Sequence, residues 1–228
     1  LDTLFSWRMG MSDRCEVIAN CVSVSDGKNP VSMLQIRLTL LMRKTPLVPG
    51  HYYHLYNRGV DRGKIFYQRK NWGFFLERFR LYCLPTYASV IAYCLMFTHY
   101  HFLILIHAVG FGEKVMQPFG VSYTKAINHQ QKRVGPLFQG PFQAILVNSE
   151  SYLLQLTRYI HLNPVAAGHV NHPDEWEFSS YRDYVGMREG TLPQSDAILG
   201  MFPDRAEYRA FVESQTRDFS PISHLLFD

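Results

Sequence analysis

The sequence is poor in cysteine and has no long, uninterrupted hydrophobic segment. Its four cysteines, Cys15, Cys21, Cys83 and Cys94, form no Cys-x-x-Cys pair, which argues against zinc-ribbon and thioredoxin-like proteins and fits a reducing compartment. No apolar run reaches the length of about 20 residues that a membrane-spanning helix needs. The first five residues carry an acid where a signal peptide carries basic charge. We therefore expect a soluble, cytoplasmic protein with no membrane partner.

Charged residues are also scarce, at 18% of 228 residues, and they are unevenly distributed. Residues 42–147 carry 13 basic and 3 acidic side chains, a net charge of +10. Residues 148–228 carry 6 arginines and 12 acids, a net charge of −6. A basic body beside an acidic segment indicates a polyanionic partner for the body, although ordinary solvated charge is the simpler alternative.

The chain is long enough for one hydrophobic core with an appendage. Residues 1–41 lack clear periodicity, and Met42 begins a segment that looks like a natural start. We expect residues 1–41 to be a disordered or spurious N-terminal extension. Residues 42–186 then form the main domain, and residues 187–228 form a C-terminal helical tail that packs on it.

Hydrophobic periodicity within the main domain predicts alternating strands and helices. We expect a strand at 51–56 closed by a turn at 57–59, strands at 87–95, 100–107 and 142–147, and helices at 71–84 and 121–133. This order predicts an α+β fold, a ferredoxin-like split βαβ antiparallel sheet with helices on one face. A further helix opens at residues 148–150 and is expected to stop before Pro164. The pattern by itself implies no function.

A histidine pair interrupts the most hydrophobic predicted strand. His99 and His101 are two residues apart, so their side chains project from the same face of a strand and Tyr100 projects from the other. Two neutral imidazoles on one face are a natural pair of metal ligands. The alternative is that they are ordinary core or surface histidines.

The helix that follows the last strand carries Tyr159 and Asn163, which lie one helical turn apart. Residues at this spacing share one side of a helix, with Cβ atoms about 6 Å apart. Taken alone, Tyr159 reads as an amphipathic core tyrosine.

The sequence from Met42 to about Gly186 resembles the bacterial REP-associated tyrosine transposases, which are single-tyrosine HUH transposases. The matching motifs are residues 53–59 (YHLYNRG), 92–96 (AYCLM), 99–103 (HYHFL), 137–140 (LFQG), 152–154 (YLL), 158–165 (RYIHLNPV) and 179–181 (SSY). Several motifs in the order of the family make a more specific signal than the histidine pair alone.

The resemblance implies a metal-dependent transposase or nuclease that cleaves and rejoins single-stranded DNA at hairpin-associated sites through a 5′-phosphotyrosine intermediate. On this reading Tyr159 is the nucleophile, and His99, His101 and Asn163 are the metal ligands. Ligand softness alone admits zinc or manganese, whereas the resemblance favours Mg²⁺ or Mn²⁺. A bound cation would stabilise charge on the phosphate and on the departing 3′-oxygen.

The expected partner is single-stranded or hairpin DNA, held by polar and basic side chains. The predicted DNA-binding residues are Asn57, Arg58, Arg62, Lys64, Arg69, Lys70, Lys132 and Arg133. The sequence leaves open whether the protein is a monomer or a homodimer.

The sequence departs from the family pattern at four positions. Phe97-Thr98 stand where Pro-Asn is usual, and Pro141 and Ala166 stand where arginines are usual. These changes leave a degenerate, non-catalytic nucleic-acid-binding relative as the main alternative. A second alternative is a metal-dependent hydrolase in which the two histidines activate a water molecule.

Overall fold

The computed structural model describes residues 47–84 and 86–214. The predicted N-terminal extension, residues 1–41, lies outside the described residues, as do Met42 and residues 215–228 of the predicted tail. The predicted domain boundaries therefore stay predictions. Among the described residues, no helix is long and apolar enough to cross a membrane.

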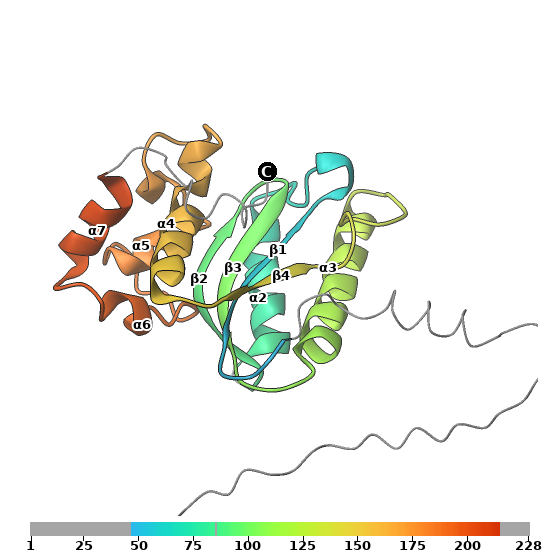
Figure 1. The fold of residues 1–228 in the computed structure, drawn as a ribbon. Coiled ribbons are helices and arrows are strands. Elements are labelled where there is room, and N and C mark those ends of the chain that lie inside the picture. Colours follow the sequence, from blue (N-terminus) through green and yellow to red (C-terminus); the bar gives the residue numbers. More distant parts are fainter. Residues whose placement is uncertain (1–46, 85, 215–228) are drawn as a thin grey trace, which may run out of the picture. The chain divides into compact units, whose positions relative to one another are not determined.

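A four-stranded antiparallel sheet forms the centre of the described structure (Figure 1). Its strands are β1 (Tyr52–Arg58), β2 (Ala88–Leu95), β3 (His99–Ile106) and β4 (Gln143–Val147). They lie in the order β2-β3-β1-β4, which is the order of a ferredoxin-like sheet. The α+β prediction is confirmed.

One face of the sheet is covered by α2 (Lys70–Cys83) and α3 (Gln117–Gln130), and their shared core is rich in aromatic rings. Phe79 stacks on Phe102 of β3 with ring centroids 4.4 Å apart. A π-helical turn, η2 (Gly112–Met116), leads directly into α3. Helical structure therefore begins nine residues before the predicted position 121. Pro118 in the first turn of α3 fits this earlier start, because proline is well accommodated there.

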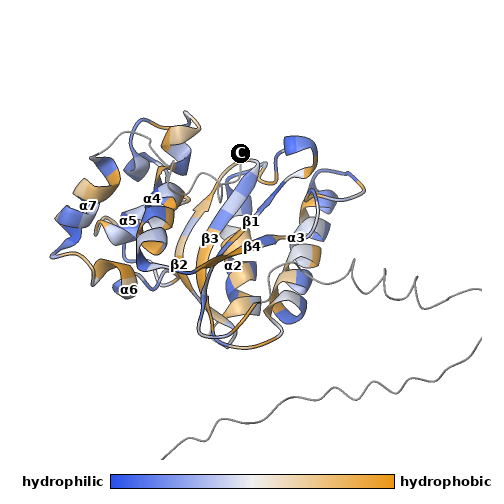
Figure 2. Ribbon diagram, in the orientation of Figure 1, coloured by the Kyte–Doolittle hydropathy of each residue, from blue (hydrophilic) through white to orange (hydrophobic). Residues whose placement is uncertain are grey.

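The opposite face is covered by α4 (Glu150–Ala166), with a second core of its own. Strands β2 and β3 reach this second core with every other residue, as the pleat requires, apart from a bulge between Val90 and Ala92. Hydrophobic residues dominate β2 and β3, whereas the short 3-10 helix η1 (Val60–Arg62) is hydrophilic (Figure 2).

Helix α4 begins as predicted and ends later than predicted. The Ser149 hydroxyl accepts a hydrogen bond from the Tyr152 backbone N–H, which caps the helix. The prediction that Pro164 stops the helix is wrong, because the helix continues to Ala166. Proline removes only its own N–H bond, and the Ala167 N–H still bonds to the Asn163 carbonyl at 2.9 Å.

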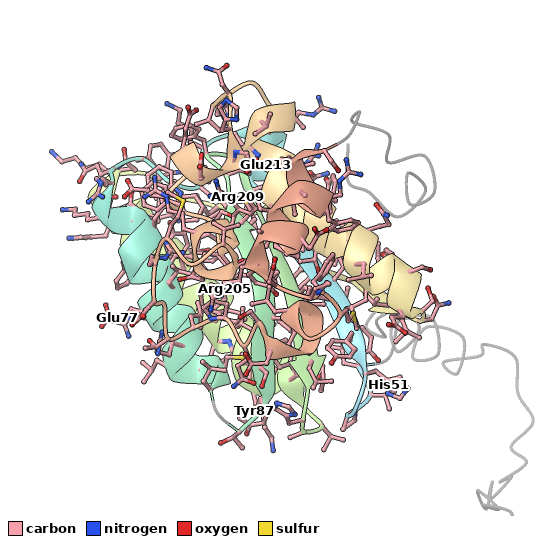
Figure 3. The ribbon with its side chains drawn as sticks, turned by 90° about the vertical axis from the view of Figure 1, so that its left-hand side faces the viewer. His51, Glu77, Tyr87, Arg205, Arg209 and Glu213 are labelled. Carbon is pink, nitrogen blue, oxygen red and sulfur yellow. The ribbon has the colours of Figure 1, made fainter. Side chains whose placement is uncertain are left out.

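Short helices follow α4 and pack over it: η3 (Pro173–Glu175), α5 (Tyr181–Tyr184), α6 (Asp196–Leu199) and α7 (Arg205–Glu213). Figure 3 views the molecule from this side, with Arg205, Arg209 and Glu213 labelled on α7. Buried Tyr208 of α7 reaches α4, where its hydroxyl bonds to the His161 ring at 2.7 Å.

Candidate active site

Strand β3 brings the predicted histidine pair onto the α4 face of the sheet. The His99 and His101 ring centroids are 5.1 Å apart with the ring planes at 79°. Tyr100 projects from the other face and packs 5.2 Å from the Phe75 ring of α2. The expected division of these three side chains between the two faces is therefore observed.

Asn163 of α4 lies between the two imidazoles. Its Oδ1 is 3.1 Å from His99 Nε2, and its Nδ2 is 3.5 Å from His101 Nε2. Donor atoms that share one small cation at about 2.1 Å are themselves about 3 to 3.5 Å apart. A cation site here would take the two ring nitrogens and, as its third ligand, the side-chain oxygen of Asn163, whose 3.1 Å distance from His99 Nε2 lies in this range. Among the described residues, no group of three or more His, Cys, Asp and Glu side chains could hold a metal ion.

The ring nitrogens that face away from Asn163 are also engaged. Thr98 Oγ1 is 3.0 Å from His99 Nδ1, and His54 Nε2 is 2.9 Å from His101 Nδ1. The change of sequence at Thr98 therefore places a hydroxyl against the first histidine. The other change, Phe97, packs edge-to-face on Trp72 and Trp176 and anchors the turn between β2 and β3.

His54 is a residue of this cluster that the sequence did not single out. It lies on β1, directly opposite Leu103 of β3 and therefore diagonal to His101. Its alternation with Tyr52 and Tyr56 places it on the α4 face, but the strand register was needed to bring it to His101.

Burial keeps the inner imidazoles neutral. Desolvation lowers the pKa of His54 to about 3. Desolvation, and then the neighbouring charges of His99, His54 and Arg58, hold the pKa of His101 well below its ordinary value. A neutral imidazole keeps one lone pair, which is the form that binds a metal.

Tyr159 lies beside the same cluster. Its ring meets the His101 ring edge-to-face at 5.4 Å and the His54 ring at 6.3 Å. The side chain is 4% exposed. The structure thus brings together all four predicted site residues, the histidine pair, Tyr159 and Asn163, and it leaves their chemical roles as predictions.

The predicted DNA-binding residues divide into three groups. Arg58 pairs in register with His99 and so lies at the same end of the sheet. Arg62 and Lys64 are exposed on η1 and the loop after it, and this segment joins the sheet end through hydrogen bonds from Gly59 to Thr98 and from Ile65 to Phe97.

The second group, Lys132 and Arg133, lies on the loop after α3. Lys132 is exposed there, and the Arg133 guanidinium donates to the Pro136 carbonyl. This loop meets η1 through the hydrogen bond from the Val60 N–H to the Leu137 carbonyl.

The remaining predicted residues are one buried asparagine on β1 and two exposed basic side chains at the start of α2. Asn57 is buried, and its side chain bonds to the Gly140 carbonyl and the Arg58 N–H. Arg69 forms an exposed ion pair with Glu177. Lys70 is exposed at the start of α2. Their contacts with DNA stay predictions.

Comparison with known proteins finds similarity to solved structures only at the level of the fold. No family model and no curated protein matches the chain. A solved structure described as a REP-associated tyrosine transposase bound to a REP hairpin is similar in fold, with a TM-score of 0.50. The similarity covers 64% of this chain and 84% of that one. At 16% sequence identity, it shows a shared fold and no more.

Proposed function

We propose that this chain is a metal-dependent DNA transposase or nuclease that cleaves and rejoins single-stranded DNA at hairpin-associated sites. The observation that carries the proposal is the meeting of Tyr159 and Asn163, one turn apart on α4, with His99 and His101 on β3. The solved structure of similar fold is a transposase bound to a DNA hairpin, which supports DNA as the partner.

The proposed reaction is a transesterification at phosphorus. The phenolic oxygen of Tyr159 forms a bond to the phosphorus, and the bond from phosphorus to the 3′-oxygen breaks. The phenolic proton leaves to solvent, and the 3′-oxygen takes up a proton. The product is a 5′-phosphotyrosine with a free 3′-hydroxyl, and the reverse reaction rejoins the strand without ATP.

His99, His101 and Asn163 would hold the divalent cation, Mg²⁺ or Mn²⁺. When bound, such a cation supplies charge stabilisation at the phosphate and at the departing oxygen. Arg58, at the same sheet end, would contribute further positive charge to the phosphate. Because Tyr159 is 4% exposed, its ring must turn outward as the DNA enters.

The test is a covalent-adduct assay on the full chain, with single-stranded hairpin oligonucleotides from the flanks of its own gene and with Mn²⁺. We expect a protein–DNA adduct that survives denaturing electrophoresis, and we expect Tyr159→Phe to abolish it. Tyr152→Phe is the matched control, because Tyr152 is a buried tyrosine two turns earlier on α4. An adduct that forms equally with Tyr159→Phe would overturn the proposal.

The same assay separates the two alternatives. A non-catalytic DNA-binding relative, which the burial of Tyr159 favours, would shift the oligonucleotide in a native gel without forming an adduct. A hydrolase that activates water would cleave the oligonucleotide as well with Tyr159→Phe as without it.

A further inference from the structure

His54 is fully buried behind the histidine pair and contacts the second histidine directly. Its Nε2 is 2.9 Å from His101 Nδ1, and the two rings stack with centroids 5.1 Å apart at 26°. Strand β1 carries His54 and strand β3 carries His101, so the contact joins the two central strands of the sheet.

The contact constrains where the protons sit. A neutral imidazole has one N–H and one lone pair. If His101 presents a lone pair at Nε2 toward Asn163, its proton is on Nδ1, and the His101 Nδ1–H then donates to His54 Nε2. His54 must in that case carry its own proton on Nδ1.

This arrangement continues through the whole cluster. In the cation-free cluster, the His99 Nε2–H would donate to Asn163 Oδ1, and the Asn163 amide would donate to His101 Nε2. His101 then donates to His54. In this single chain of donors and acceptors, His54 is the terminal acceptor. Binding of a cation through His99 Nε2 would require the His99 proton on Nδ1 instead, where it faces the Thr98 hydroxyl.

His54 has a cost that its packing does not explain. Its Nδ1 is buried and has no hydrogen-bond partner among the described residues. A buried polar atom without a partner opposes folding, and an apolar side chain of similar size would remove that penalty. A histidine at this position must therefore contribute something that an apolar side chain would not, and its hydrogen bond goes to His101.

We propose that His54 is a positioning residue that holds His101 in the tautomer with its lone pair on Nε2, aimed at the space beside Asn163. This inference rests on the proposed function, since it assigns His101 as a metal ligand. Partners of this kind orient the ring of a ligating histidine and raise its basicity. Thr98 contacts His99 Nδ1 in the corresponding place, but its hydroxyl can donate as well as accept.

The experiment is a Mn²⁺ titration of the purified full chain, followed by electron paramagnetic resonance of free Mn²⁺, together with thermal unfolding. We expect His54→Leu to weaken Mn²⁺ binding by about 10- to 100-fold without lowering the melting temperature. His54→Gln, whose amide oxygen can accept from His101 Nδ1–H, should bind Mn²⁺ within a few-fold of the wild type.

A matched control is His161→Gln. His161 is equally buried on the α4 side, but it bonds to Ser180 and Tyr208 instead of to the histidine pair. We expect this variant to lower the melting temperature and to leave Mn²⁺ binding unchanged. A second readout is the long-range ¹H–¹⁵N NMR spectrum, in which His101 should appear as the Nδ1–H tautomer in the wild type.

Four results would overturn the inference. Unchanged Mn²⁺ affinity in His54→Leu would overturn it and leave the proposed function intact, as would an Nε2–H tautomer for His101 in the wild type. Equal loss of melting temperature and of affinity in both His54 variants would show a merely structural role. Failure of the wild type to bind Mn²⁺ would overturn both the inference and the metal-dependent function.

Discussion

Two histidine clusters lie on the α4 side of the sheet, and they are built differently. In the His161 cluster, both ring nitrogens meet hydroxyl groups, Tyr208 at 2.7 Å and Ser180 at 2.8 Å. In the ligand cluster, formed by His99, His101 and Asn163, the Nε2 atoms of the two rings converge on one side-chain amide at 3.1 and 3.5 Å.

The difference indicates which cluster holds the structure together and which is suited to bind a ligand. Short bonds to two hydroxyls satisfy both ring nitrogens of His161 and tie α4 to α7 and to Ser180, which directly precedes α5. In the ligand cluster, by contrast, the 3.5 Å contact between Asn163 and His101 is at the limit of a hydrogen bond, so the hydrogen bonding of this cluster is weaker. Burial alone would not distinguish the two clusters, because His101 and His161 are both fully buried.

The largest expected effect comes from removing the histidine pair. His99→Ala with His101→Ala should slow formation of the DNA adduct by about 100-fold or more, because both proposed imidazole ligands of the cation are removed. The measurement is the initial rate of adduct formation in Mn²⁺ with saturating hairpin oligonucleotide. An unchanged rate would show that the ligand cluster, like the His161 cluster, has a structural role and no role in the reaction.

The sequence predicted the parts of this contrast that depend on local spacing. Alternation along β3 placed His99 and His101 on one face, and helical spacing placed Tyr159 and Asn163 on one side of α4. The sequence could not reveal the partners of His101 and His161. His54 lies 47 residues from His101 in the chain, and Tyr208 lies 47 residues from His161. Those contacts depend on strand register and on the packing of α7, which no local pattern encodes.

The fold shows the same division between local and distant information. The order of strands and helices predicted the ferredoxin-like sheet, because strands and helices differ in the period of their hydrophobic residues. The end of α4 was misjudged at Pro164, where burial of the helix offsets the loss of one hydrogen bond. The early start of α3 was missed, since Phe111, Val115 and Met116 hold η2 through distant core contacts.

The His161 cluster is expected to contribute to the stability of the fold. His161→Leu should lower the free energy of unfolding by about 2 to 4 kcal/mol, because it leaves the buried hydroxyls of Ser180 and Tyr208 without this partner. Urea unfolding followed by far-UV circular dichroism measures the change. A loss below about 0.5 kcal/mol would show that the hydroxyls find other partners and that the cluster contributes little to stability.

Acid should act on the His161 cluster in a defined pH window. Burial lowers the pKa of His161 from 6.5 to about 3. Below pH 6.5, His161 therefore becomes protonated in the unfolded chain while it stays neutral in the folded chain. Stability is therefore fully present above pH 6.5 and falls as the pH decreases toward 3, by about 1.4 kcal/mol for this histidine by pH 5.5. Urea unfolding at pH 7.5 and at pH 5.5 measures it, and His161→Gln should reduce the difference between the two values.

The smallest expected effect concerns the charges around each cluster. Arg62 lies at the sheet end that holds His99. Arg209 lies on α7 (Figure 3), the helix that carries Tyr208 of the His161 cluster, with Asp174 at 3.8 Å and Glu213 at 3.9 Å. Arg62→Gln should weaken binding of a hairpin oligonucleotide by about 2- to 5-fold and make its dependence on salt shallower by roughly one phosphate contact.

Arg209→Gln removes the same charge from the chain and is the matched control. Its guanidinium already faces two carboxylates, so a phosphate would have to compete with them, and hairpin binding should change by less than about 1.5-fold. Fluorescence anisotropy between 50 and 200 mM NaCl measures both variants. Equal losses would mean that DNA responds to the net charge of the chain. A loss confined to Arg62→Gln would locate the DNA at the end of the sheet where His99 meets Asn163.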